Sequence, residues 1–276
     1  MSINSVNTNR QAVFALQSLN LTNSELGGVQ KRVSTGYRVA DAKDDGGAFA
    51  VAQAVRSDVA GVTAVGEQLG GVKGVLQTTF ASLSVVSDTM KQVRATLTRL
   101  ADGSINGDQR EQYVKQYELL TDQISDFIDD ATYNGRTLLS TGTASGGDIT
   151  GIRNEGGGTF TIEAVDGGTL KLSTTAPADA TSAQAMIASG GDFDDIDGLI
   201  STALNEFGAS MQYVENQIVY NSKKVDAMNE GLGALVDADL AKESSKLQAL
   251  QTRQQLGVQT LGIANQGPQV LLSLFR

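Results

Sequence analysis

The sequence contains no cysteine, no histidine and no tryptophan, and it has only two prolines in 276 residues. Without histidine or cysteine it cannot build a Ser-His-Asp or Cys-His catalytic arrangement or an ordinary zinc site. Without cysteine its stability owes nothing to disulfides. No glycine run ends in Gly-Lys-Ser or Gly-Lys-Thr, as a phosphate-binding loop would. These absences predict a protein that is not an enzyme and needs no cofactor.

Basic clusters are also lacking, because 21 Lys and Arg residues against 31 Asp and Glu residues give a net charge of −10. Binding to nucleic acid needs clustered positive charge against the phosphates, so we expect no nucleic-acid partner. No stretch approaches the ~20 apolar residues of a membrane span, and we expect none. The first residues, MSINSVNTNRQAVFALQSLN, lack the basic start and apolar block of a cleaved signal peptide, so none is expected.

Apolar residues recur at alternating spacings of three and four over most of the chain, which is typical of amphipathic helices. The first long row covers residues 51–100 and predicts a single helix of about 50 residues, with Thr79 as its weak position. A second row covers residues 113–131. A third covers residues 200–235 and is interrupted at Asn221.

Helices of this length bury their narrow apolar seams only against one another, so we expect a rod-like antiparallel bundle or coiled coil of long helices. Glycines interrupt the first row, although each lowers helix stability by ~1 kcal/mol relative to alanine. Small residues permit close approach, either of helices within the chain or of neighbouring subunits, and the sequence leaves both open. These glycines are Gly61, Gly66, Gly70, Gly71 and Gly74.

Residues 140–182 have a different composition, rich in glycine, serine and threonine. Phe160 and Ile162 alternate with polar residues, and the following DGG favours a turn toward Leu170 and Leu172. We therefore expect a β-hairpin here, at the exposed end of the rod. The predicted fold class is mainly α, with a small β-containing outer insertion.

Both ends of the chain carry further helical stripes, and the last helix has two of them. The N-terminal stripe consists of Val13, Leu16, Leu19, Leu26, Val29 and Val33, and the two C-terminal rows consist of Leu240, Leu247, Leu250 and Leu261, and of Leu256, Ile263 and Val270. One face of the last helix can pack on the N-terminal helix, so the other is expected to contact other molecules. The final residues add Leu271, Leu272, Leu274 and Phe275, although chain ends usually fray.

Two acidic motifs indicate helix starts more than ligand sites. In GGDFDDIDG, residues 190–198, alignment of the last glycine with the EF-hand glycine places Phe193 at the first ligand position, which argues against a calcium loop. Aspartates at the positive end of a helix explain the motif better. The motif DAKDDGG places carboxylates at the head of the first long helix, where a solvated cap and a charged subunit contact are both compatible with it. Its charged residues are Asp41, Lys43, Asp44 and Asp45.

The two ends of the chain resemble bacterial flagellin. The resemblance is carried by SINSVNTNRQAVFALQSLN, by VSTGYRVADAKDDGGAFAVA before the first long helix, by TYNGRTLL after the second, and by LVDADLAKESSKLQALQTRQQLGVQTLGIANQGPQVLLSLFR at the finish. The segment DADLAKESSKLQ resembles sequences of the alphaproteobacterial branch of the family. The resemblance covers everything except the variable middle of the chain.

This resemblance implies a filament subunit in which residues 1–40 and 236–276 form terminal coiled-coil helices in the filament core. Residues 41–139 and 183–235 would form a helical rod domain, and residues 140–182 a short outer region. Core assembly contacts would come from Val13, Leu16, Leu19, Leu26, Leu247, Leu250, Leu256, Ile263, Val270, Leu271, Leu274 and Phe275. Contacts between rods would come from Asp41, Lys43, Asp44, Asp45 and Arg94.

The resemblance also implies a helical homopolymer outside the cell that serves swimming motility, with sibling flagellins as further components. Transport would use the flagellar export apparatus and an export chaperone, and the filament cap and hook-associated proteins would be partners. A hook-filament junction protein shares both terminal patterns and is an alternative. A secreted coiled-coil binding module or adhesin is a second alternative.

Two further family features concern the rod and the outer region. Residues 92–96, QVRAT, stand where many flagellins read Arg-Val-Arg-Glu-Leu, and Gln116 stands where a receptor-contacting Glu occurs. We therefore expect weak recognition by the innate immune flagellin receptor. Some flagellins carry O-linked glycans on outward hydroxyls, for which the residues expected to be exposed are Thr143, Ser145, Thr159, Thr161, Ser173, Thr174, Thr175, Thr181 and Ser182.

Overall fold

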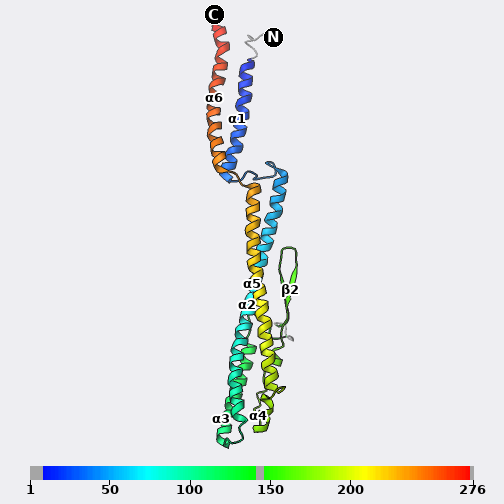
Figure 1. The fold of residues 1–276 in the computed structure, drawn as a ribbon. Coiled ribbons are helices and arrows are strands. Elements are labelled where there is room, and N and C mark those ends of the chain that lie inside the picture. Colours follow the sequence, from blue (N-terminus) through cyan, green and yellow to red (C-terminus); the bar gives the residue numbers. More distant parts are fainter. Residues whose placement is uncertain (1–8, 141–145, 274–276) are drawn as a thin grey trace. The chain divides into compact units, whose positions relative to one another are not determined.

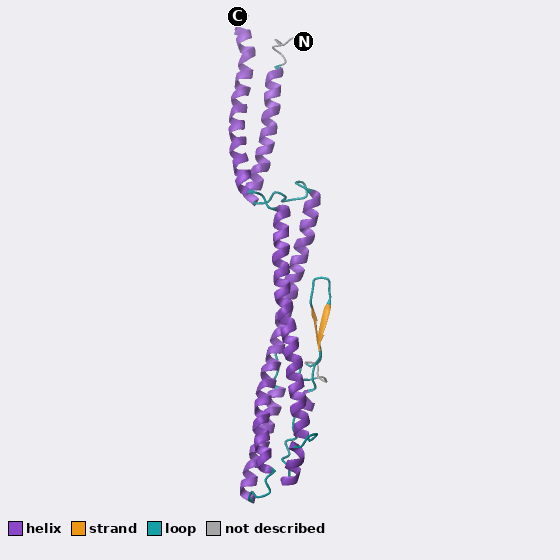
Figure 2. Cartoon of the chain, in the orientation of Figure 1, coloured by secondary structure: helices purple, strands orange, loops and turns teal. Residues whose placement is uncertain are grey.

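The computed structural model describes residues 9–140 and 146–273, with side chains up to residue 266. Long helices dominate the described residues, and a single small sheet accompanies them (Figures 1 and 2). The helices are α1 (Arg10–Thr35), α2 (Gly46–Leu100), α3 (Gly107–Asp129), α4 (Ala180–Ile187), α5 (Asp192–Val236) and α6 (Leu240–Ser273). The strands are β1 (Ile149–Ile152) and β2 (Thr159–Ile162), followed by the 3-10 helix η1 (Gly167–Leu170). The predicted fold class is confirmed.

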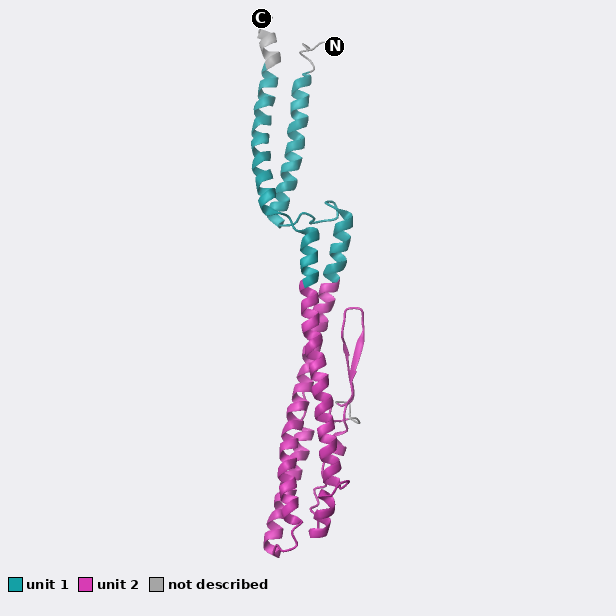
Figure 3. Ribbon diagram, viewed as in Figure 1, with its two compact units in different colours: residues 1–57, 227–276 teal, residues 58–226 magenta. Residues whose placement is uncertain are grey.

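The chain divides into two compact units (Figure 3). One unit contains residues 1–57 and 227–276, and the other contains residues 58–226. The long helices α2 and α5 contribute residues to both units.

The core of the 58–226 unit is formed mainly by α2, α3 and α5. From Val62 to Leu100 the apolar row of α2 is buried at nearly every step of three or four residues, with Val72 half-buried, and this continuous burial supports a helix of 55 residues. Tyr117 and Ile124 of α3 and Phe207 and Val214 of α5 complete the core. The fully buried residues of α2 include Leu69, Leu76, Leu83, Met90 and Leu97.

The glycines of α2 fall into two groups. A Cβ added at Gly74 would lie 2.6 Å from Cζ of Tyr133, and one added at Gly61 would lie 3.1 Å from Cβ of Glu155. Around Gly66, Gly70 and Gly71, the described residues place nothing within 4 Å of such a Cβ. Packing within the chain therefore explains Gly61 and Gly74, and it does not explain the other three.

The β-hairpin is present, but its predicted pairing is wrong. Strand β2 pairs antiparallel with β1, which precedes it, in the register Ile149–Ile162 to Ile152–Thr159. The DGG sequence begins η1 instead, because the Asp166 carboxylate accepts a hydrogen bond from the backbone N–H of Gly168. Leu170 and Leu172 consequently enter the core of the unit and form no strand.

The expected position of the hairpin is also wrong. The hairpin lies alongside α2 and α5 within the 58–226 unit (Figure 1), and its loop contacts both helices. One end of this unit is formed by the α2–α3 turn and by the segment that joins α4 to α5 (Figure 1). The hairpin is therefore a third layer on the two long helices.

Candidate assembly surface

Helices α1 and α6 pair side by side in the unit formed by residues 1–57 and 227–276 (Figure 1). Their less exposed positions alternate by three and four, which is the spacing of a coiled-coil seam. Leu26, Val29 and Leu250 are buried there, and Val33 and Leu247 pack against them. Leu19 continues the seam, since its Cδ1 would lie 3.2 Å from a Cβ added at Gly257. We call this set of contacts the seam.

Polar contacts fix the register of the seam along its length. The Asn9 side-chain amide donates to the Ala264 carbonyl at 2.7 Å, and the Gln254 amide donates to Asn23 Oδ1 at 2.8 Å. Near the opposite end of the pair, Arg32 Nε lies 3.1 Å from Glu243 Oε2 as an ion pair. These contacts close the seam but leave the opposite sides of both helices without a partner in the described residues.

Seven large apolar side chains in the paired stretches of α1 and α6 are exposed to solvent. Their exposed fractions range from 48% at Leu16 to 70% at Ile263. We call this set the outward residues, and it consists of Val13, Phe14, Leu16, Leu21, Leu256, Val258 and Ile263. Several exposed large apolar side chains on one helix pair are typical of a surface that another protein covers.

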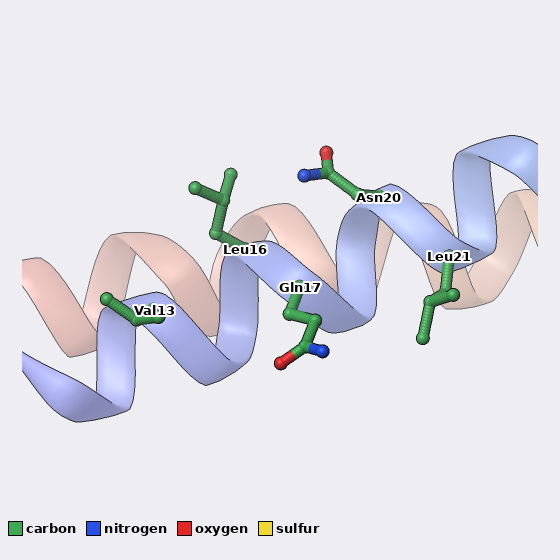
Figure 4. A pocket seen from close by; sticks show the side chains of 5 residues that line it. All are labelled: Val13, Leu16, Gln17, Asn20 and Leu21. Carbon is green, nitrogen blue, oxygen red and sulfur yellow. The ribbon is translucent and has the colours of Figure 1, made fainter.

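Part of this exposed surface is hollowed. A depression of ≈ 380 Å³ on α1 is lined by Val13, Leu16, Gln17, Asn20 and Leu21 (Figure 4). The polar side chains among its walls are uncharged, so a partner side chain that enters it leaves no ion unpaired. The depression is open and mainly apolar, as the contact surface for another protein would be.

The structure separates the predicted core residues into two sets. Leu19, Leu26, Leu247 and Leu250 belong to the seam, while Val13, Leu16, Leu256 and Ile263 are outward residues. Leu240, expected in the same row as Leu247, is 49% exposed at the start of α6. The side chains of Val270, Leu271, Leu274 and Phe275 lie outside the described residues.

The predicted rod-contact carboxylates have partners within the chain. Lys31 Nζ lies 2.7 Å from Asp41 Oδ2 and 2.8 Å from Asp44 Oδ2, and it holds the pKa of both carboxyls below the usual range. Asp45 caps α2 by accepting a hydrogen bond from the Ala48 N–H. Asp45 is thus a cap of α2, whereas Asp41 and Asp44 bind Lys31 of α1, and together the three carboxylates order the segment between α1 and α2. Lys43 takes part through its backbone N–H, which donates to Asp41.

Arg94 and the predicted glycan sites lie in the 58–226 unit. The Arg94 guanidinium lies 5.8 Å from the centroid of the Phe193 ring, at the start of α5. Thr159, Thr161, Ser173, Thr174, Thr175 and Thr181 are exposed, as expected. Ser182 is different, because it is half-buried and its hydroxyl completes the capping box of α4 with Asp179. Thr143 and Ser145 lie outside the described residues.

Among the described residues, no group of three or more Asp and Glu side chains is placed to hold a metal ion. No helix in the same part of the chain has the length and hydropathy of a membrane span.

Sequence reasoning overlooked Phe14 and Leu21, which are outward residues seven positions apart. A search for a second heptad row on α1 could have found them, since their spacing equals two helical turns.

Known protein families match both ends of this chain. The model of the bacterial flagellin N-terminal helical region matches residues 6–144, and that of the C-terminal helical region matches residues 194–275. A flagellar hook-associated protein of Vibrio parahaemolyticus has a similar fold, with a TM-score of 0.59 over 70% of this chain and all of that one. At 14% identity, this likeness concerns the fold alone.

Full-length relatives agree with these matches. The chain is 36% identical over 282 residues to flagellin FljK of Caulobacter vibrioides, with 100% of both chains covered. It is 31% identical to a flagellin of Brucella melitensis and 28% identical to flagellin C of Rhizobium meliloti, with 99% of each chain covered. The chain therefore belongs to the bacterial flagellin family, whose members are structural subunits of the extracellular flagellar filament.

Proposed function

We propose that this chain polymerises into the flagellar filament by burying its outward residues against other copies of itself. The observation that carries this proposal is the double character of the α1–α6 pair, which has a closed seam and an exposed apolar surface. Burial of that surface would supply the free energy of assembly, at roughly 25 cal/mol for each Å² of apolar area removed from water.

The same proposal assigns a structural role in the filament to each region of the chain. Residues 1–40 and 236–276 would form the filament core, and residues 41–139 and 183–235 the surrounding rod domain. The tail residues Val270, Leu271, Leu274 and Phe275 would extend the core contacts. Asp41, Asp44 and Asp45 would support assembly by ordering the segment between α1 and α2, because their intrachain contacts already serve that purpose. Lys43 and Arg94 would contact neighbouring rods.

The surroundings of the filament supply the remaining partners. We propose that the chain leaves the cell through the flagellar export apparatus with a chaperone, and that it meets the filament cap and hook-associated proteins outside. Its role in motility would be mechanical and not catalytic. Sibling flagellins with the same α1–α6 pair could enter the same filament.

O-linked glycans would attach to the outer region. Thr159 and Thr161 of β2 are exposed, and Thr161 Oγ1 lies 3.4 Å from Thr150 Oγ1 on the same side of the hairpin. The intact mass of protein taken from native filaments tests this proposal. A mass above the 28.8 kDa of the bare chain, mapped to these peptides, is the expected result. The bare mass would reject glycosylation.

Seeded polymerisation tests the main proposal. Purified chain is added to short filament fragments and observed by negative-stain electron microscopy, beside a chain that lacks residues 267–276. Long filaments from the intact chain and none from the shortened chain are expected. A hook-filament junction protein or a secreted binding module would instead remain as monomers or short oligomers under conditions in which a known flagellin extends the seeds.

A further inference from the structure

The loop that joins β1 to β2, residues 153–158, is bound to the surface of α5. The Arg153 carbonyl accepts hydrogen bonds from the side-chain amides of Gln217 at 3.0 Å and Asn221 at 3.3 Å. One turn further along α5, Lys224 forms an ion pair with the Glu155 carboxylate. Three successive positions on one side of α5 therefore hold this loop, which we call the tip loop.

The tip loop also contacts α2, through Glu155. A Cβ added at Gly61 would lie 3.1 Å from Cβ of Glu155 and 3.9 Å from its Cα. Glycine at this position therefore allows the backbone of Glu155 to lie against α2, while its carboxylate reaches Lys224 on α5. Glu155 thus bridges the two long helices.

The tip loop is closed by its own hydrogen bonds. The Arg153 N–H donates to the Gly158 carbonyl at 2.7 Å, and the Gly158 N–H donates to Asn154 Oδ1 at 2.8 Å. The backbone angle φ of Gly157 is +78°, a left-handed conformation that glycine adopts without steric cost. A loop closed in this way presents the Arg153 carbonyl and the Glu155 side chain to the helices as a fixed pair.

The contacts occur where α2 and α5 lack the cover of α3. Helix α3 ends beside Ser82, whose hydroxyl donates to the Phe127 carbonyl. Beyond that point the Tyr133 ring covers α2 at Gly74, and the tip loop covers it at Gly61. These two glycines are about 20 Å apart along α2 at 1.5 Å of rise per residue, so contacts from residues 133 and 155 reach α2 well beyond the end of α3.

We propose that the tip loop is a strap that holds α2 and α5 together in the two-helix part of the 58–226 unit. The strap gives a reason for two residues that break the helical patterns, since Gly61 admits the loop and the buried Asn221 binds it. Asn221 occupies a position where the heptad pattern predicts an apolar residue. An apolar residue there would remove one of the two amide hydrogen bonds to the Arg153 carbonyl.

The rate of trypsin cleavage after Arg153 reports whether the tip loop is bound to α5, because the cleaved peptide bond includes the carbonyl group that α5 binds. We compare the soluble full-length chain with Gly61→Gln, which places a side chain beneath Glu155, and with Lys224→Gln, which removes the ion pair. Gly66→Gln is the matched control, since it has the same helix and substitution but open space around it. Circular dichroism checks that each variant is folded.

The strap predicts that cleavage between Arg153 and Asn154 becomes about tenfold faster in Gly61→Gln and in Lys224→Gln, and stays at the wild-type rate in Gly66→Gln. Equal rates in all four proteins would overturn the docking of the loop. Backbone hydrogen exchange provides the second readout, because a strap also protects the helices beneath it. Exchange in residues 58–66 and 214–226 should rise about tenfold in the two strap variants, with residues 86–97 unchanged. Faster cleavage without faster helix exchange would overturn the strap and leave a loop that is merely attached.

Discussion

Replacement of Ile263 by serine weakens the filament without weakening the subunit. Ile263 is 70% exposed, so the folded monomer has little to lose at this position. Full burial of an isoleucine side chain is worth about 1.5–3 kcal/mol, and the part still exposed accounts for about 1–2 kcal/mol of that. If assembly buries this side chain, Ile263→Ser raises the critical concentration for polymerisation about five- to thirtyfold, since 1.4 kcal/mol corresponds to a factor of ten.

The assay is sedimentation of seeded filaments, with the monomer that remains in the supernatant giving the critical concentration. Gln259→Ser is the control, because Gln259 is a polar, exposed residue of the same helix. Thermal unfolding of both monomeric variants should match the wild type. An unchanged critical concentration for Ile263→Ser would refute the assignment of this side chain to a subunit interface.

Three further predictions concern the monomer. Thr79 is fully buried in α2 and its hydroxyl has no hydrogen-bond partner among the described residues, so Thr79→Val should stabilise the chain by about 1 kcal/mol in urea unfolding; a loss of stability would show that the hydroxyl is bonded. Burial raises the pKa of Tyr117 to about 12, with a smaller contribution from the charge of Asp192. Because the unfolded state ionises first, stability present below about pH 10 should fall by about 2–3 kcal/mol as pH rises to 12. Tyr117→Phe should remove this alkaline loss of stability, although it also removes the hydrogen bond from the tyrosine hydroxyl to the Ser173 carbonyl and so lowers stability near neutral pH. The same alkaline loss of stability in the variant would contradict its assignment to Tyr117. Leu250→Ala should destabilise the α1–α6 pair by about 2–5 kcal/mol, measured by hydrogen exchange in α1, because Leu250 is buried in the seam.

The long helices could be predicted from the sequence because burial of one stripe imposes a spacing that is visible in the residues themselves. Leu69, Leu83 and Leu97 are buried as that spacing requires. The two faces of α6 were visible for the same reason, since Leu250 and Ile263 belong to different rows. A pattern of this kind is local, and it survives without knowledge of the partner.

The pairing of β2 and the strap could not be predicted, because each depends on a contact that local pattern does not contain. Gly151 interrupts the apolar alternation of β1, which hid the true partner of Phe160. Asn221 was visible only as a break in a heptad row, and its partner Arg153 is 68 residues away in the chain. The contact of Phe193 with Arg94 could not be predicted either, because it joins residues near the ends of two different helices.

The central claim is that the outward residues become buried between copies, and thiol labelling tests it most directly. The natural chain has no cysteine, so Ile263→Cys introduces a single reporter on the outward surface of α6. The account predicts rapid modification of this thiol in the monomer and protection in the filament, whereas a Thr174→Cys thiol, at an exposed position of the proposed outer region, should be modified rapidly in both. Equally rapid modification of the thiol at position 263 in monomer and filament would contradict the account.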